Sequence, residues 1–219
     1  MKLKIQSVEF RRCVICGAGP VENIDILKPL LRKNDFVIAA DGGILLAKQL
    51  GLEIGQIVAD FDSIPREQAH DTHAPVSLLP VKKDDTDTMV AARIGLEHGF
   101  KDFLFLGASG GRLDHTLANL AVMLFLAENN AKAALADEHN FVEMHLPGQV
   151  IVEPVRNCYL SLLPYGGSVS GLTVRNAEYE LDNATLTPDY PLGISNEFSD
   201  RPVEISFKQG VLMVFFSKD

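Results

Sequence analysis

The sequence predicts an α/β protein with an N-terminal three-layer α/β domain on a mostly parallel sheet and a smaller C-terminal antiparallel β-sandwich domain. In the first two-thirds of the chain, short apolar runs alternate with segments of helical periodicity, which is typical of parallel strands covered on both faces. After about residue 140, the helical periodicity stops and short strand-like runs follow between Gly, Pro and Asn turns. We therefore predict domains at residues 1–142 and 143–219.

Apolar runs and helical spacing define the elements expected in the first domain. The predicted strands are Arg12–Gly17, Phe36–Ala40, Ile57–Asp60, Val76–Leu79, Phe103–Gly107 and Ala133–Asp137. The predicted helices are Ile24–Lys33, Gly43–Leu50, Asp87–His98 and Leu113–Asn129.

In the second domain, the expected strands lie in the runs QVIVEP, CYLSLLPYGG, SVSGLTVR, ATLTP, PVEISFKQG and VLMVFF. The last two runs are separated by Lys208–Gly210, a short segment that ends in glycine. This spacing predicts that Val203–Phe207 and Val211–Phe216 form a β-hairpin. The stretch Asn140–Gly148 is interpreted as the junction between the domains.

The composition excludes several functional classes. A net charge of −9 argues against a nucleic-acid surface, which needs clustered Lys and Arg. We expect no membrane association, because no apolar run is long enough to span a bilayer, and the first residues do not resemble a secretory signal. A cytoplasmic location is predicted. The C-x-x-C of Cys13 and Cys16 is interpreted as part of the core, since residues three apart on a strand face opposite sides.

Acids and glycines follow two of the predicted strands. The run that ends at Ala40 leads into Asp41-Gly42-Gly43, which suits either a tight turn or the close approach of a ligand to the backbone. The run that begins at Ile57 leads into Asp60 and Asp62, which share one face of an extended segment. These two acids are either solvated or hold a cation such as Mg²⁺.

The helix predicted at Asp87 follows a mixed cluster of charges, Lys82-Lys83-Asp84-Asp85-Thr86-Asp87. Acids at a helix N-terminus are favoured by the helix dipole, so capping alone could explain Asp87. However, lysine beside several carboxylates also suits a phosphate bound together with a metal ion. Lys83, Asp84 and Asp87 are therefore candidate phosphate and metal residues.

The most specific pattern is GASGGRLDH, which runs from Gly107 to His115. Glycines between a strand and a helix free backbone N–H groups to bind phosphate, and an arginine fork fits phosphate oxygens. The candidate phosphate-binding residues are Ser109, Gly110, Gly111, Arg112, Asp114 and His115. The pattern is not a P-loop, and the GAGP at Gly17–Pro20 lacks the third glycine of a dinucleotide fingerprint.

In their order, the motifs DGG, DFDS, KDDTD, GASGGRLDH and GISNE resemble those of the thiamine pyrophosphokinase family. The resemblance implies transfer of a diphosphoryl group from ATP to the hydroxyl of thiamine, giving thiamine diphosphate and AMP. It also implies a homodimer with active sites at the interface. Asp60, Asp62 and Asp87 would hold Mg²⁺, and Asp41 would share their acidic, catalytic pocket.

The same resemblance also implies which residues would contact each substrate. Lys83, Ser109 and Arg112 would face the nucleotide phosphates, with Asp114 and His115 nearby. Ser195 and Asn196, from GISNE, would help to build the thiamine pocket. Three alternatives stay open at this point: a pyrophosphokinase for another acceptor, a metal-dependent phosphohydrolase, and a sensor that binds thiamine or a nucleotide without turnover.

Overall fold

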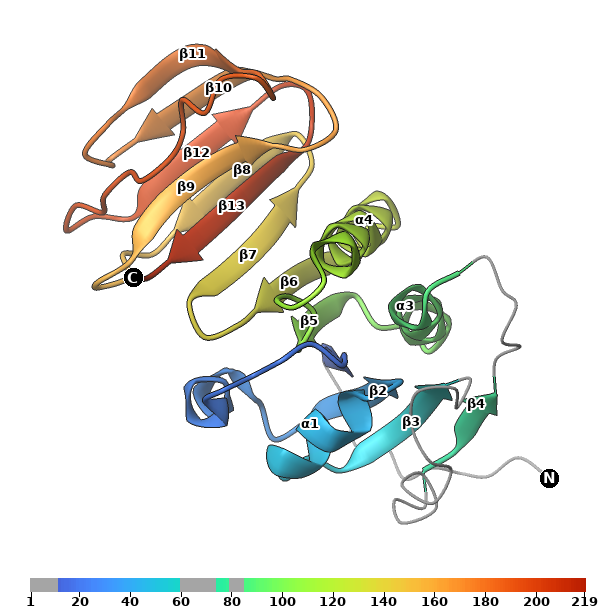
Figure 1. The fold of residues 1–219 in the computed structure, drawn as a ribbon. Coiled ribbons are helices and arrows are strands. Elements are labelled where there is room, and N and C mark those ends of the chain that lie inside the picture. Colours follow the sequence, from blue (N-terminus) through green and yellow to red (C-terminus); the bar gives the residue numbers. More distant parts are fainter. Residues whose placement is uncertain (1–11, 60–73, 79–84) are drawn as a thin grey trace. The chain divides into compact units, whose positions relative to one another are not determined.

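The computed structural model describes residues 12–59, 74–78 and 85–219 (Figure 1). The chain folds as two compact units, Met1–Val122 and Met123–Asp219. Each unit has its own sheet architecture, and the two kinds of sheet match the predicted fold class.

The N-terminal unit contains a sheet of parallel strands in the order β4-β3-β2-β1-β5. The strands are β1 (Arg12–Cys16), β2 (Asp35–Ala40), β3 (Ile54–Ala59), β4 (Val76–Leu78) and β5 (Asp102–Leu106). The five strands predicted for this region are confirmed, with ends that differ by a few residues. Strand β1 is central and buried at every residue, as expected of a parallel sheet covered on both faces.

The order of the strands reverses between β1 and β5. From β1 to β4 the chain adds each strand on the same side, and β5 then pairs with the other edge of β1. In open α/β sheets, ligands bind outside the carboxyl ends of the strands at such a switch in order. The topology therefore directs the search for a site to the loops that follow β1 and β5.

In the part of the chain that the structure describes, the α-helices are α1 (Gly43–Gln49), α3 (Asp87–Glu97) and α4 (Leu113–Glu128). Helices α1 and α3 both pack against β1, β2 and β3. Helix α1 connects strands that add in one direction across the sheet, whereas α3 connects β4 to β5 in the other direction. Because such crossovers are right-handed, the two helices lie on opposite faces of the sheet (Figure 1). The predicted three layers are confirmed.

The predicted helix Ile24–Lys33 is wrong. This segment forms two short 3-10 helices, η1 (Ile24–Ile26) and η2 (Lys28–Leu30). Pro29 has no N–H to donate to the preceding helical turn. In addition, the Leu30 carbonyl accepts from the Arg12 guanidinium at 2.7 Å, and this guanidinium also forms a buried ion pair with Asp35.

The C-terminal unit is an antiparallel β-sandwich, as predicted. One layer holds β6 (Lys132–Ala136), β7 (Asn140–His145), β13 (Leu212–Ser217) and β9 (Tyr159–Pro164), in that order. The other holds β11 (Leu181–Leu186), β10 (Val169–Arg175), β12 (Val203–Phe207) and β8 (Gly148–Val152). Apolar side chains of both layers share one core. The stretch interpreted as a junction contains β7, so it is part of the sandwich.

The predicted hairpin of the last two strands is wrong. Strand β12 pairs with β10 and β8 in one layer, while β13 pairs with β7 and β9 in the other. Both edges of each strand are therefore occupied by other partners. The turn that separates them ends at Gly210, whose φ of 93° and close approach to the Ser168 carbonyl allow the chain to change layers.

Candidate active site

A crevice of about 540 Å³ lies at the carboxyl ends of β1, β2 and β5, where the strand order reverses. Its walls come from the loops after these strands, from the start of α3 and from the first two turns of α4. The lining residues are Gly17–Pro20, Ala40, Asp41, Thr86–Thr88, Gly107–Arg112, His115, Ala118 and Asn119. All of them belong to the N-terminal unit. The structure thus brings the residue that follows β2 and the glycine-rich loop that follows β5 to one crevice, whereas Asp60 and Asp62, which were expected at the end of β3, lie outside the described residues.

Two glycine loops form the floor of the crevice by direct backbone contact. Gly17 N–H donates to the Leu106 carbonyl at 2.8 Å, and Gly19 N–H donates to the Gly107 carbonyl at 2.7 Å. A Cβ at Gly19 would lie 2.6 Å from that Gly107 oxygen, so the contact requires glycine. GAGP is an incomplete dinucleotide fingerprint and is not among the candidate residues predicted from the sequence. Its position directly after a buried strand was the signal that could have identified it.

Two of the predicted carboxylates line the crevice. Asp41 follows β2 with a φ of 49°, in the left-handed region that Asp tolerates better than most residues, and its N–H donates to the Val58 carbonyl at 2.8 Å. Asp87 is the first residue of α3, whose N-cap Thr86 accepts from the Met89 N–H. Both acids are half-buried. Both acids therefore line the same crevice as the glycine-rich loops.

The glycine-rich loop after β5 supplies another part of the lining. Gly107, Gly110 and Gly111 all have positive φ, at 60°, 79° and 58°, which explains why glycine recurs there. Of the predicted phosphate residues, Ser109, Gly110, Gly111, Arg112 and His115 line the crevice.

Arg112 and Asp114 are exposed and form a two-pronged ion pair. Arg112 Nε and Nη2 donate to the two carboxylate oxygens of Asp114 at 3.1 and 2.6 Å. The hydrogen bond from Arg112 lowers the pKa of Asp114. Asp114 lies beside the crevice rather than in its wall, and its contact is with the arginine predicted to bind phosphate.

Asp60, Asp62, Lys83 and Asp84 lie outside the described residues, so their predicted roles stay predictions. Within residues 12–59, 74–78 and 85–219, no three His, Cys, Asp or Glu side chains gather into a possible metal site. Strand β3 ends at the buried Ala59, and its register sets Val58 beside Ala40, the residue before Asp41.

Cys13 and Cys16 are buried in β1, as predicted for core residues. Burial raises the pKa of the Cys16 thiol to about 12, and it raises the pKa of Cys13 as well. A buried thiol that resists ionisation is a poor nucleophile and a poor metal ligand.

We therefore expect a thiol reagent at pH 8 to modify one cysteine rapidly in the native protein, the half-buried Cys158. Cys13 and Cys16 should react only after unfolding, because below pH 12 folding keeps Cys16 protonated. Counting modified thiols by mass spectrometry, with and without denaturant, checks this. Rapid native labelling of Cys13 or Cys16 would show that β1 is not buried as described.

In the C-terminal unit, the segment Gly193–Glu197 runs along the edge strand β9. The Leu162 N–H donates to the Gly193 carbonyl at 2.7 Å, and Leu160 and Asn196 exchange both backbone hydrogen bonds. Ser195 is exposed with a φ of 57°, and its N–H donates to Ser161 Oγ at 3.0 Å. The predicted substrate residue Ser195 is thus presented on a fixed turn.

Asn196 is buried, and its amide holds a neighbouring tyrosine in place. Its Oδ1 accepts from the Tyr179 N–H at 3.0 Å, and its Nδ2 donates to the Tyr179 carbonyl at 2.8 Å. The Tyr179 side chain is 64% exposed beside this clamp. Asn196 therefore has a structural role, because it holds the Tyr179 backbone in place. Tyr179 was missed by sequence reasoning, because a lone tyrosine among acids gives no signal.

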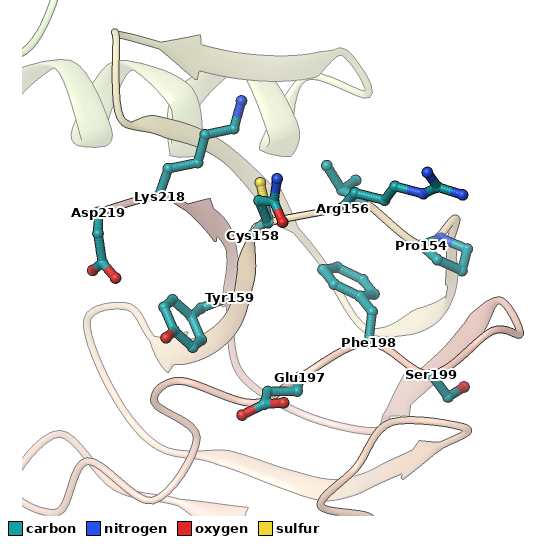
Figure 2. Close-up of a pocket in the computed structure, with 11 residues that line it drawn as sticks. Pro154, Arg156, Cys158, Tyr159, Glu197, Phe198, Ser199, Lys218 and Asp219 are labelled. Atoms are coloured by element: carbon teal, nitrogen blue, oxygen red, sulfur yellow. The ribbon is translucent and has the colours of Figure 1, made fainter.

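A second hollow of about 620 Å³ lies in the same unit, next to this segment (Figure 2). It is lined by Pro154–Tyr159, Glu197–Ser199, Lys218 and Asp219. Figure 2 shows the aromatic rings of Tyr159 and Phe198 among its charged side chains. Two cations, Arg156 and Lys218, balance two carboxylates, Glu197 and Asp219, so its charges favour neither an anion nor a cation.

Fold and crevice together define a class: an α/β protein with a candidate ligand site at the switch in strand order and with a β-sandwich in its C-terminal unit. Two family models match the chain. The model of the thiamin pyrophosphokinase catalytic domain covers residues 27–135, and that of the thiamin pyrophosphokinase vitamin B1 binding domain covers residues 149–212. The matches fall on either side of the boundary predicted after residue 142, and the boundary itself stays a prediction.

Relatives agree with these matches over nearly the whole chain. The chain is 29% identical to a thiamine pyrophosphokinase of Bacillus subtilis over 94% of its own length and 98% of that protein. The crystal structure of the thiamine pyrophosphokinase from Bacillus subtilis superposes with a TM-score of 0.87 at 28% identity, covering 95% of this chain and all of that one. The one from Geobacillus thermodenitrificans gives 0.84 at 30% identity, over 95% and 98%. The chain belongs to the thiamine pyrophosphokinase family.

Proposed function

We propose that this chain transfers the diphosphoryl group of ATP to the hydroxyl of thiamine, giving thiamine diphosphate and AMP. Family membership supports the reaction. The observation that supports its location is the crevice at the β1–β5 switch, which is lined by Asp41, Asp87 and two glycine loops. Carboxylates together with backbone-rich phosphate loops suit a metal–nucleotide complex.

The roles follow from the chemistry of diphosphoryl transfer. Attack at the β-phosphorus requires the triphosphate to be held in line with the hydroxyl while charge develops on the α–β bridge oxygen. Ser109, Gly110 and Gly111 lie where their backbone can approach phosphate oxygens. Arg112 pairs with Asp114 through Nε and Nη2, and its remaining N–H groups are candidate donors to the same oxygens. His115, in the first turn of α4, lies in the same wall.

The donor set fits Mg²⁺, which prefers oxygen ligands and is bound through few carboxylates plus substrate phosphates. Asp41 and Asp87 line one crevice. We propose that Asp60, Asp62 and Asp87 hold the ion, with Asp41 in the same acidic pocket and Lys83 and Asp84 near the phosphates. When bound, the ion would neutralise charge on the triphosphate.

The acceptor site is proposed to include Ser195, on its exposed turn, with Asn196 as its buried support. Tyr179, clamped by Asn196, adds an exposed aromatic surface suited to a flat cationic ring. We further propose a homodimer whose active sites lie at the subunit interface. Within the described residues, no helix is both long and apolar enough to cross a membrane; the cytoplasmic location stays a prediction.

Product analysis separates this proposal from its rivals. Purified protein is incubated with ATP and Mg²⁺, with and without thiamine, and AMP and thiamine diphosphate are followed by chromatography. We expect both products to form in equal amounts and only when thiamine is present. AMP formation without thiamine would indicate a hydrolase, and no product at all would indicate a binding protein.

A further inference from the structure

The strongest feature outside the predicted site residues is a hydrogen-bond chain, buried at Asn119 and exposed at Thr86, that joins two walls of the crevice. Asn119, on α4, is 7% exposed. Its Nδ2 donates to the Ala108 carbonyl at 2.7 Å, and its Oδ1 accepts from Thr88 Oγ1 at 2.8 Å. Thr88 Oγ1 lies 3.1 Å from Thr86 Oγ1, which accepts from the Met89 N–H at 3.2 Å. We call this the Thr86–Asn119 chain.

The direction of every hydrogen bond in the chain is determined. The Ala108 carbonyl can only accept, so the amide nitrogen of Asn119 must face it and the amide oxygen must face Thr88. Thr88 therefore donates its single hydroxyl proton to Asn119 Oδ1. Because that proton is used, Thr86 must donate to Thr88, and Thr86 in turn accepts from Met89. The chain has one arrangement of protons and no alternative.

At one end, the chain fixes the backbone that carries Asp87. Thr86 and Thr88 are the two sequence neighbours of this acid, and both hydroxyls are held. The position of the Asp87 carboxylate is thereby tied to α4 through Asn119. A residue that must meet a metal ion within a few tenths of an ångström gains from such support.

At the other end, the chain fixes a peptide group of the glycine-rich loop. The Ala108 carbonyl and the Ser109 N–H belong to one planar trans peptide, so they point in opposite directions. Holding the carbonyl against Asn119 therefore sets the direction of the Ser109 N–H, in a residue that lines the crevice. If the Ala108–Ser109 peptide rotated, its carbonyl oxygen would point in the direction in which the Ser109 N–H now points, and an acceptor would replace a donor there.

We propose that Asn119 and Thr88 are positioning residues. They hold Asp87 and the Ser109 peptide in one fixed arrangement for the binding of the metal–nucleotide complex. This inference rests on the proposed function. Neither residue needs to touch the reacting atoms. Their effect is to hold two groups from different elements in place: the Ser109 peptide, in the loop after β5, and Asp87, at the start of α3.

The test compares Thr88→Val with Thr88→Ser. Valine keeps the shape but removes the hydroxyl, which leaves Asn119 Oδ1 buried without its donor. We expect the KM for Mg·ATP and the Kd for Mg·α,β-methylene ATP to rise about tenfold, equivalent to about 1.4 kcal/mol. The KM for thiamine should change by less than about twofold. Serine restores the hydroxyl and should restore nucleotide affinity to within about twofold.

Hydrogen exchange gives a readout independent of turnover. In Thr88→Val, amides of residues 107–112 should exchange faster, although Thr88 lies on another element, and Thr88→Ser should remain like the wild type. The inference is overturned if Thr88→Val only lowers the melting temperature while nucleotide affinity and loop exchange stay unchanged. It is also overturned if serine fails to rescue.

The wild-type protein separates failure of this inference from failure of the proposed function. If the wild type forms thiamine diphosphate but Thr88→Val binds nucleotide normally, only the positioning role is wrong. If the wild type neither binds α,β-methylene ATP nor forms product, the proposed function is wrong and the positioning role falls with it.

Discussion

Replacing Asp87 with asparagine is expected to lower kcat at least about 100-fold, which corresponds to about 2.7 kcal/mol of transition-state stabilisation. Asp87 is the first residue of α3 and lines the crevice. Asparagine keeps the size of the side chain and removes the charge that would hold a divalent cation. The fold should persist, because a first-turn acid contributes only about 0.3–1 kcal/mol through the helix dipole.

Glu97→Gln is the matched control for this substitution. Glu97 is the last residue of the same helix, is exposed, and loses the same charge in the variant. Because an acid at a helix C-terminus opposes the helix dipole, this control should be neutral or slightly stabilising, with unchanged turnover. Steady-state kinetics and thermal melting of the two variants check the prediction. Near-normal kcat in Asp87→Asn would refute the proposed metal role of this acid.

Gly43→Ala is expected to destabilise the protein by about 3 kcal/mol or more, which would lower the melting temperature by roughly 6–12 °C in a chain of this size. Gly43 begins α1, directly after Asp41-Gly42. A Cβ at this position would lie 1.8 Å from the Cys16 carbonyl oxygen and 2.4 Å from its carbon. Both atoms are backbone of the central strand β1, so no side chain can move aside.

Gly167→Ala controls for the loss of glycine itself. No atom lies within 4 Å of the Cβ that this substitution would add, so its melting temperature should stay close to that of the wild type. Thermal unfolding followed by circular dichroism compares the two variants. Equal melting temperatures would show that α1 does not approach β1 as closely as described. Within DGG, Gly43 therefore allows α1 to pack closely against β1, whereas Asp41 lines the crevice.

The strands of the N-terminal unit could be predicted because their signal is local. Five apolar runs became β1 to β5, and the polar residues after β2 and β5 line one crevice. In contrast, Ile24–Lys33 has helical spacing but does not form an α-helix. There Pro29 and the long-range hydrogen bond from Arg12 to the Leu30 carbonyl override the local pattern.

Features that depend on distant pairing could not be read from the sequence. Strands β12 and β13 look like a hairpin because they are adjacent in the chain, yet each is paired on both edges with strands from elsewhere. The role of Asn119 could not be predicted for the same reason. An asparagine inside a helix carries no motif, and its importance appears only when Thr88 and Ala108 are found on either side of it.

The transfer of an intact diphosphoryl group is tested most directly by following labelled phosphate. The protein is incubated with thiamine, Mg²⁺ and ATP labelled with ³²P at either the α or the γ position, and the products are separated. We predict that the γ label appears in thiamine diphosphate and the α label in AMP, with no thiamine monophosphate formed on the way. A γ label in thiamine monophosphate together with ADP, or label in free phosphate or pyrophosphate, would contradict this account of the site.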